Sequence, residues 1–152
     1  MDALYKLGAK ALGSRLKRVS DSLMTEVSKI YSELDLPFDA PCYPLFSYIL
    51  QNEDKGISLT DASQALGITH AAVSQKASQL KKRDYIALSA LEADKRSKVI
   101  QLTDNGKAVA TRLAPFWQAI DTAMQPMMTS TLPLLSQIAM LEDYVQTGKF
   151  RE

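Results

Sequence analysis

The chain has 152 residues, of which 46% are hydrophobic and 23% are charged, with a net charge of +1 and a single cysteine. These values are those of a soluble globular protein with a core of its own, and they exclude an internal disulfide. No apolar run approaches a membrane span, and the first residues lack the apolar segment of a signal peptide. We therefore expect a cytoplasmic protein without membrane contact, folded as a single domain over residues 1–152.

The first predicted element is a long helix from about Leu4 to Leu34, within an N-terminal segment of residues 4–36. Its apolar residues recur at helical spacings of three and four: Leu16, Val19, Leu23, Val27, Ile30 and Leu34. Pro37 and Pro41 end it. A shorter helix is expected to begin near Pro44 and to carry apolar side chains into the core.

Residues 58–75 then have the pattern of a helix, a glycine turn and a second helix. Ser58 and Asp61 fit a shortened capping box, and Gly67 fits the left-handed position that ends a helix. Thr69 is a suitable cap for the second helix. The apolar stripe of that second helix is Val73, Ala77 and Leu80. The pattern predicts a helix-turn-helix, in which the second helix reads a DNA groove.

The predicted outer face of this second helix carries small, amide and basic side chains, which suit the major groove. The candidate DNA contacts on it are Thr69, His70, Ala71, Ser74, Gln75, Lys76 and Ser78. Lys76 flanks this face, and it either snorkels or reaches a phosphate; we favour the phosphate. His70 is the only histidine, and we interpret it as a DNA contact or a solvated residue and not as a metal ligand.

Two short β-rich runs, 85–89 and 98–102, follow the second helix and are separated by a charged turn. They predict a β-hairpin. The fold class is thus mainly α with a small β-hairpin wing: a winged helix-turn-helix over residues 44–103, with helices before it and after it. Residues 104–148 are predicted to form these last helices, with a kink at Pro115 and a break bracketed by Pro126 and Pro133.

Charge is unevenly distributed along the chain. Residues 70–100 contain seven basic and three acidic residues, a balance of +4, so the remainder sums to −3. This asymmetry concentrates attraction for phosphate on one surface. The flanking helices carry more apolar residues than a winged helix needs, and we interpret them as dimerisation helices whose two-fold axis matches a palindromic site; packing within one chain is the alternative.

Three motifs make the chain resemble the MarR family of bacterial transcriptional regulators. They are Leu66-Gly67-Ile68-Thr69 with Val73-Ser74, then Asp94-Lys95-Arg96, then Leu102-Thr103-Asp104-Asn105-Gly106. The resemblance is strongest from Ile57 to Leu113. It implies a dimeric winged helix-turn-helix that binds DNA, in many relatives under the control of a small phenolic or aromatic carboxylate.

The resemblance also assigns roles in the wing. Arg96 is expected to insert into the minor groove, and Asp94 to hold its guanidinium by a salt bridge; a solvated ion pair is the alternative. Lys95 and Lys98 are further candidate DNA contacts. Gln75 stands where the family often has arginine, so it is expected to pair with adenine in place of guanine.

Two further candidate sites each have two interpretations. Tyr43, Phe46 and Tyr48 are candidates for a pocket that binds a small aromatic effector, although aromatic residues near a helix junction are more often part of the core. Cys42 is interpreted as a buried small residue, with a redox sensor as the alternative.

The predicted function is a homodimeric, sequence-specific regulator that binds double-stranded DNA at a palindromic operator, most simply a ligand-responsive repressor. The alternative is a dimeric winged-helix module that binds protein without specific DNA readout. We expect no enzymatic activity, since the sequence offers no nucleophile and base pair and no phosphate loop. We also expect no metal and no cofactor.

Overall fold

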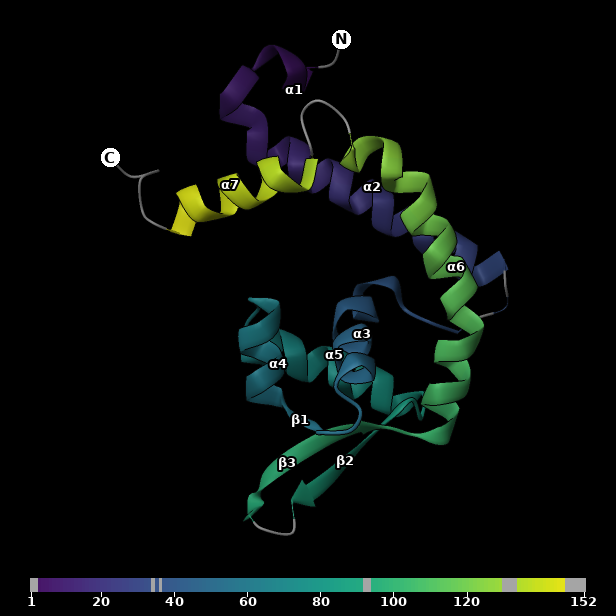
Figure 1. Ribbon diagram of the computed structural model, residues 1–152. Coiled ribbons are helices and arrows are strands. Elements are labelled where there is room, and N and C mark those ends of the chain that lie inside the picture. Colours follow the sequence, from purple (N-terminus) through teal and green to yellow (C-terminus); the bar gives the residue numbers. More distant parts are fainter. Residues whose placement is uncertain (1–2, 34, 36, 92–93, 130–133, 147–152) are drawn as a thin grey trace. The chain divides into compact units, whose positions relative to one another are not determined.

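The computed structural model describes the backbone of residues 3–33, 35, 37–91, 94–129 and 134–146, and the side chains in these ranges except those of residues 90–98. The chain forms two compact units, Met1–Lys107 and Ala108–Glu152, and each is described by itself (Figure 1). Among the described residues, no helix is both long and apolar enough to cross a membrane.

The N-terminal segment is interrupted where the sequence predicted one continuous helix from residue 4. It consists of α1 (Ala3–Lys6), the 3₁₀ turn η1 (Gly8–Ala11) and α2 (Leu12–Glu33). Gly8 has φ +62°, a left-handed conformation that ends α1, and the next turn is then 3₁₀. The predicted start near residue 4 agrees with α1, but the prediction of one continuous helix was wrong, because hydrophobic periodicity does not reveal a backbone break.

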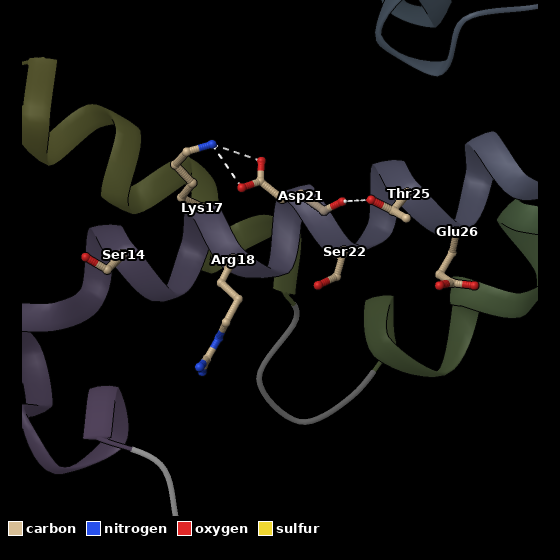
Figure 2. Close-up of a pocket in the computed structure, with 7 residues that line it drawn as sticks. All are labelled: Ser14, Lys17, Arg18, Asp21, Ser22, Thr25 and Glu26. Atoms are coloured by element: carbon tan, nitrogen blue, oxygen red, sulfur yellow. Dashed lines mark hydrogen bonds and ion pairs between the residues drawn. The ribbon is translucent and has the colours of Figure 1, made fainter.

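Helix α2 has two contrasting faces. Its apolar stripe of Leu12, Leu16, Val19 and Leu23 is between 42% and 56% exposed. The opposite side is polar and forms an open depression, in which Lys17 and Asp21 pair at 2.9 Å (Figure 2). Of the α2 side chains, only Tyr31 is buried. A 22-residue helix that leaves its apolar stripe in solvent has a surface suited to a partner.

The winged body follows in the order η2 (Ala40–Cys42), α3 (Tyr43–Gln51), β1 (Ile57–Ser58), α4 (Leu59–Leu66), α5 (His70–Lys82), β2 (Ile86–Leu91) and β3 (Asp94–Leu102). The sheet is antiparallel with the strand order β1-β3-β2, and the β2–β3 hairpin extends beyond the helices (Figure 1). The sequence predicted the hairpin and missed β1. That strand is two residues long and forms by pairing Ile57 with Ile100.

Four aromatic rings form the centre of this unit. The ring of Phe38 lies 5.4 Å from Tyr31, 5.2 Å from Phe46 and 6.2 Å from Tyr85, measured between centroids. All four residues are at most 5% exposed. The contacts of Phe38 with Tyr31 and Phe46 are edge-to-face and that with Tyr85 is stacked, and aromatic pairs of both kinds stabilise a core beyond the area that they bury. The end of α2, the segment after it, α3 and the start of the wing therefore share one core.

The last helix of the unit, α6 (Asp104–Met128), begins with a polar connection to the end of α5. The Thr103 hydroxyl donates to the Asp84 carbonyl at 2.5 Å and accepts from the Gly106 N–H at 2.9 Å. The Asn105 side-chain amide donates to the Arg83 carbonyl at 3.2 Å. The Leu-Thr-x-x-Gly motif is thus the joint between α5 and α6.

The second unit contains the rest of α6 and α7 (Leu134–Gln146). Helix α6 continues through Pro126 to Met128, so the expected break does not begin at Pro126; Pro133, expected at its far side, lies outside the described residues. Helix α7 has no buried residue, and its Leu135, Met140 and Val145 are at least 55% exposed. The predicted fold class, mainly α with a small β wing, is confirmed.

Candidate nucleic-acid interface

Helix α4 begins at a complete capping box. The Asp61 N–H donates to the Ser58 hydroxyl at 3.1 Å, and the Ser58 N–H donates to the Asp61 carboxylate at 3.0 Å. The Ser58 hydroxyl also donates to that carboxylate at 2.7 Å, and this bond together with the backbone one lowers the pKa of Asp61 below its ordinary 3.8. The sequence prediction of the cap is confirmed.

Ser58→Ala is expected to lower the free energy of unfolding by about 1 kcal/mol at pH 7, because both hydrogen bonds between the Ser58 hydroxyl and Asp61 are lost. The folded state holds Asp61 ionised at a lower pKa than the unfolded chain does. That part of the stability is therefore complete above pH 3.8 and is lost as the pH falls through the folded-state pKa. Urea unfolding measures the free energy of unfolding of both proteins at pH 7 and at pH 3. The difference between wild type and Ser58→Ala should be smaller at pH 3. Ser78→Ala on exposed helical surface is the control and should change stability by less than about 0.5 kcal/mol.

The turn between α4 and α5 follows from three neighbouring residues. Gly67 has φ +62° and ends α4, and nothing crowds the position of a Cβ there, so glycine is needed for its backbone conformation. The Ile68 carbonyl accepts from the Ser63 hydroxyl at 2.7 Å. The Thr69 hydroxyl accepts from the Ala72 N–H at 3.2 Å and caps α5. The angle between the two helices is thereby fixed by local bonds.

Helix α5 divides into a buried face and an open face, as predicted. Val73, Ala77 and Leu80 are at most 4% exposed. On the other side, five candidate DNA contacts are exposed and one, Ser74, is half-buried. The exposed five are Thr69, His70, Ala71, Gln75 and Ser78. The structure therefore brings these candidates together on one open surface of α5.

Lys76 lies apart from this group. Its ammonium donates to the Pro41 carbonyl at 2.6 Å, a contact that neither of the two sequence interpretations included. Two more polar residues of the same side of α5 also contact the segment before α3: Gln79 accepts from the Cys42 thiol at 3.2 Å, and Arg83 pairs with Asp39 at 3.0 Å. Sequence reasoning missed Gln79 and Arg83 in this role, although their helical spacing from Lys76 marks one face.

The wing candidates lie where only the backbone is described. β3 begins at Asp94 and pairs with β2 from Leu91↔Asp94 to Ile86↔Leu102, with a register shift next to Leu91. The side chains of Asp94, Lys95, Arg96 and Lys98 are outside the described residues. Their roles stay predictions.

The three aromatic candidates for an effector pocket do not share one environment. Phe46 is completely buried in the aromatic core. Tyr43, in the first turn of α3, is 39% exposed, and Tyr48 is half-buried. Phe46 is therefore an aromatic residue of the core, which is the alternative that the sequence analysis stated for these residues.

Cys42 is completely buried at the start of α3. Burial raises the pKa of the thiol, and the nearby Lys76 ammonium offsets only part of this effect. A thiol with a raised pKa has little of the thiolate form that reacts with oxidants and metals. The burial of the Cys42 side chain confirms its interpretation as a buried small residue.

We expect Cys42 to react with a soluble disulfide reagent at pH 7 more than about tenfold slower in the folded protein than in urea, because both access and ionisation are reduced. The chromophore released by the reagent gives both rates. Equal rates in the two states would contradict this and restore the redox-sensor interpretation.

The comparisons with known proteins agree with this geometry. The family model described as MarR family matches residues 35–97. Among solved structures, a MarR/EmrR family transcriptional regulator from Acinetobacter sp. ADP1 is 20% identical with a TM-score of 0.68, covering 94% of this chain and 97% of its own. S. aureus MepR in complex with DNA is 16% identical with a TM-score of 0.71, covering 90% and 97%. The heme sensor PefR from Streptococcus agalactiae, bound to heme, is 22% identical with a TM-score of 0.58, covering 90% of each chain. No match was found among curated proteins.

The fold and the open face of α5 define a winged helix-turn-helix protein. The MarR family model matches the winged-helix segment of the chain, residues 35–97, so the resemblance found in the sequence is confirmed over that segment.

Proposed function

We propose that this protein is a homodimeric transcriptional regulator that binds a palindromic operator in double-stranded DNA and acts as a ligand-responsive repressor. The observation that carries the proposal is the open face of α5, presented after the Gly67 turn by a MarR-family winged helix. That helix contains three lysines and no acidic residue, so its field favours the approach of phosphate. MepR, which shares the fold, was solved with DNA.

The exposed apolar stripe of α2 and the exposed apolar residues of α7 support a second copy of the chain as partner. The stripe of α2 and the exposed residues of α7 belong to different units, and each on its own is unusual for the surface of a monomer. In this proposal residues 4–36 and 104–148 supply the dimer contacts, and residues 44–103 bind DNA. A two-fold dimer would place its two α5 helices in successive major grooves, about 34 Å apart.

In the DNA complex we assign base contacts to Gln75 and its neighbours Ala71, Ser74 and Ser78, and contacts at the start of the helix to Thr69 and His70. Arg96 is assigned to the minor groove, with Asp94 as its partner and Lys95 and Lys98 at the phosphates. A glutamine at the reading position pairs with adenine N6 and N7. Operators with adenine at that step are thus the expected targets.

The test is a mobility-shift titration against the DNA upstream of its own gene, at several salt concentrations. Wild type should bind more weakly as salt rises, and Gln75→Ala should reduce specific affinity by about 5- to 150-fold. Gln51→Ala, at the end of α3, is the matched control and should bind as wild type does. Arg96→Ala should weaken binding and reduce the salt dependence.

Binding that changes neither with salt nor with Gln75→Ala or Arg96→Ala would overturn direct DNA readout. That result would favour the alternative, a dimeric winged-helix module for protein partners.

We also propose that a small aromatic carboxylate acts as effector beside α3, with Tyr43 and Tyr48 as its contacts. Because Phe46 is buried, it would serve as the floor of such a site and not as a recognition group. Benzoate, used as a probe, should release DNA from wild type at a lower concentration than from Tyr43→Ala. An equal response of both proteins would remove Tyr43 from the effector site.

A further inference from the structure

The segment of residues 37–42, called here the strap, lies directly before α3 and contacts α5 and the residues that follow it. Four of its residues take part. Asp39 accepts two bonds from the Arg83 guanidinium, at 3.3 Å from Nε and 3.0 Å from Nη2. The Pro41 carbonyl accepts from Lys76 at 2.6 Å. The remaining two contacts are the Cys42 thiol to Gln79 and the Tyr85 hydroxyl to the Pro37 carbonyl, at 3.2 and 2.9 Å.

Three of these contacts follow one line, which runs along α5 and ends at Arg83, the first residue after the helix. Residues 76, 79 and 83 are spaced three and four apart, so they lie on one side of the helix, next to the buried stripe. The DNA-facing candidates Ala71, Gln75 and Ser78 are outside this line. Two of the cations that made residues 70–100 basic, Lys76 and Arg83, therefore have their charged groups bound to the protein itself.

The strap is in turn fixed to the end of α2. Phe38 in the strap packs edge-to-face on Tyr31, the buried residue of α2, at 5.4 Å. A displacement of the end of α2 would therefore be passed to α5 through residues 37–42. Each polar contact is partly exposed and weak by itself, but a bidentate arginine and carboxylate pair restricts direction more than a single bond does.

We propose that Arg83 and Asp39 are positioning residues: their ion pair, with the Lys76 contact, fixes the direction of α5 on the strap, and neither residue contacts DNA. This inference rests on the proposed function, since it concerns how the DNA-reading helix is held. A basic residue of a DNA-binding segment is ordinarily assigned to a phosphate contact. The proposal assigns Arg83 to the positioning of α5 instead.

The sign of the effect of Asp39→Asn distinguishes the two roles. If Arg83 positions the helix, loss of the carboxylate should weaken specific binding by about two- to fivefold, the scale of a partly exposed ion pair. If Arg83 contacts phosphate, removing a negative charge beside it should leave binding unchanged or tighten it. Asp54→Asn, an exposed aspartate in the turn after α3, makes the same charge change and is the matched control.

The experiment measures the dissociation constant of a fluorescent operator duplex over a salt series for wild type, Asp39→Asn, Arg83→Gln, Asp54→Asn and the exchanged pair Asp39→Arg with Arg83→Asp. We expect Asp39→Asn and Arg83→Gln to weaken binding to a similar extent, with the salt slope of wild type retained. The exchanged pair should return to within about twofold of wild type, a rescue that general damage to folding would not show.

Three results would overturn the inference while leaving the proposed function intact: Asp39→Asn binds as tightly as Asp54→Asn, Arg83→Gln reduces the salt slope by about one, or the exchanged pair stays as weak as Arg83→Gln. Absence of DNA binding by wild type itself would instead overturn the proposed function, and with it this inference.

Discussion

Gly106→Ala is expected to destabilise the winged unit by about 3 kcal/mol, at the upper end of the cost of overpacking. A Cβ at this position would lie 2.0 Å from the Tyr85 carbonyl oxygen and 3.3 Å from Leu102 Cδ2. The first of these is a backbone atom held by the Thr103 N–H at 3.1 Å, so it cannot move away as a flexible side chain would. Urea unfolding followed by circular dichroism measures the loss.

Gly13→Ala provides the matched control for this substitution. Gly13 lies in α2, and nothing is within 4 Å of the position of its Cβ. Alanine there should leave stability unchanged or raise it by up to about 1 kcal/mol, because glycine is a poor helix former. A Gly106 variant as stable as the Gly13 variant would show that the joint between α5 and α6 tolerates a side chain, which would contradict the prediction.

The second large effect is expected from Val19→Asp, which places a charge in the middle of the apolar stripe of α2. Val19 is 56% exposed in the single chain, so the folded monomer should tolerate aspartate. If the stripe is the contact between two copies, the charge would be buried there without a partner and the dimer would dissociate. DNA affinity should then fall by at least about 100-fold, because two half-sites are no longer bound together.

Light scattering coupled to size exclusion gives the mass of the assembly, and the mobility shift gives the affinity. Ser14→Asp introduces the same charge on the polar side of the same helix (Figure 2) and should stay dimeric. A Val19→Asp protein that remains a dimer would exclude the α2 stripe as the interface.

The features that the sequence predicted correctly are governed by nearby residues. The Ser58 and Asp61 box, the Gly67 turn and the Thr69 cap each depend on residues at most a few positions apart. Local rules of capping and backbone conformation therefore suffice to place the helix-turn-helix. The buried stripe of α5 was equally predictable, since helical periodicity alone determines it.

The features that the sequence did not give depend on contacts between distant segments. Lys76 binds the carbonyl of a residue 35 positions earlier, and Arg83 binds Asp39 across 44 positions. Strand β1 exists only because it pairs with β3. In the same way the family resemblance marked Thr103 and Gly106 as a motif, but only the fold shows that the glycine permits close approach to Tyr85.

The contacts of Tyr85 determine when the end of α5 is fixed as the chain is synthesised. Its hydroxyl bonds to Pro37, 48 positions away, and its carbonyl accepts from Thr103. These long-range closures hold the C-terminal end of α5 and are slow to form compared with the helix itself. On the ribosome, the contacts of residues 37–42 with α5 can form once Tyr85 has emerged, and the last bonds that hold the end of α5 form only after Thr103 has emerged.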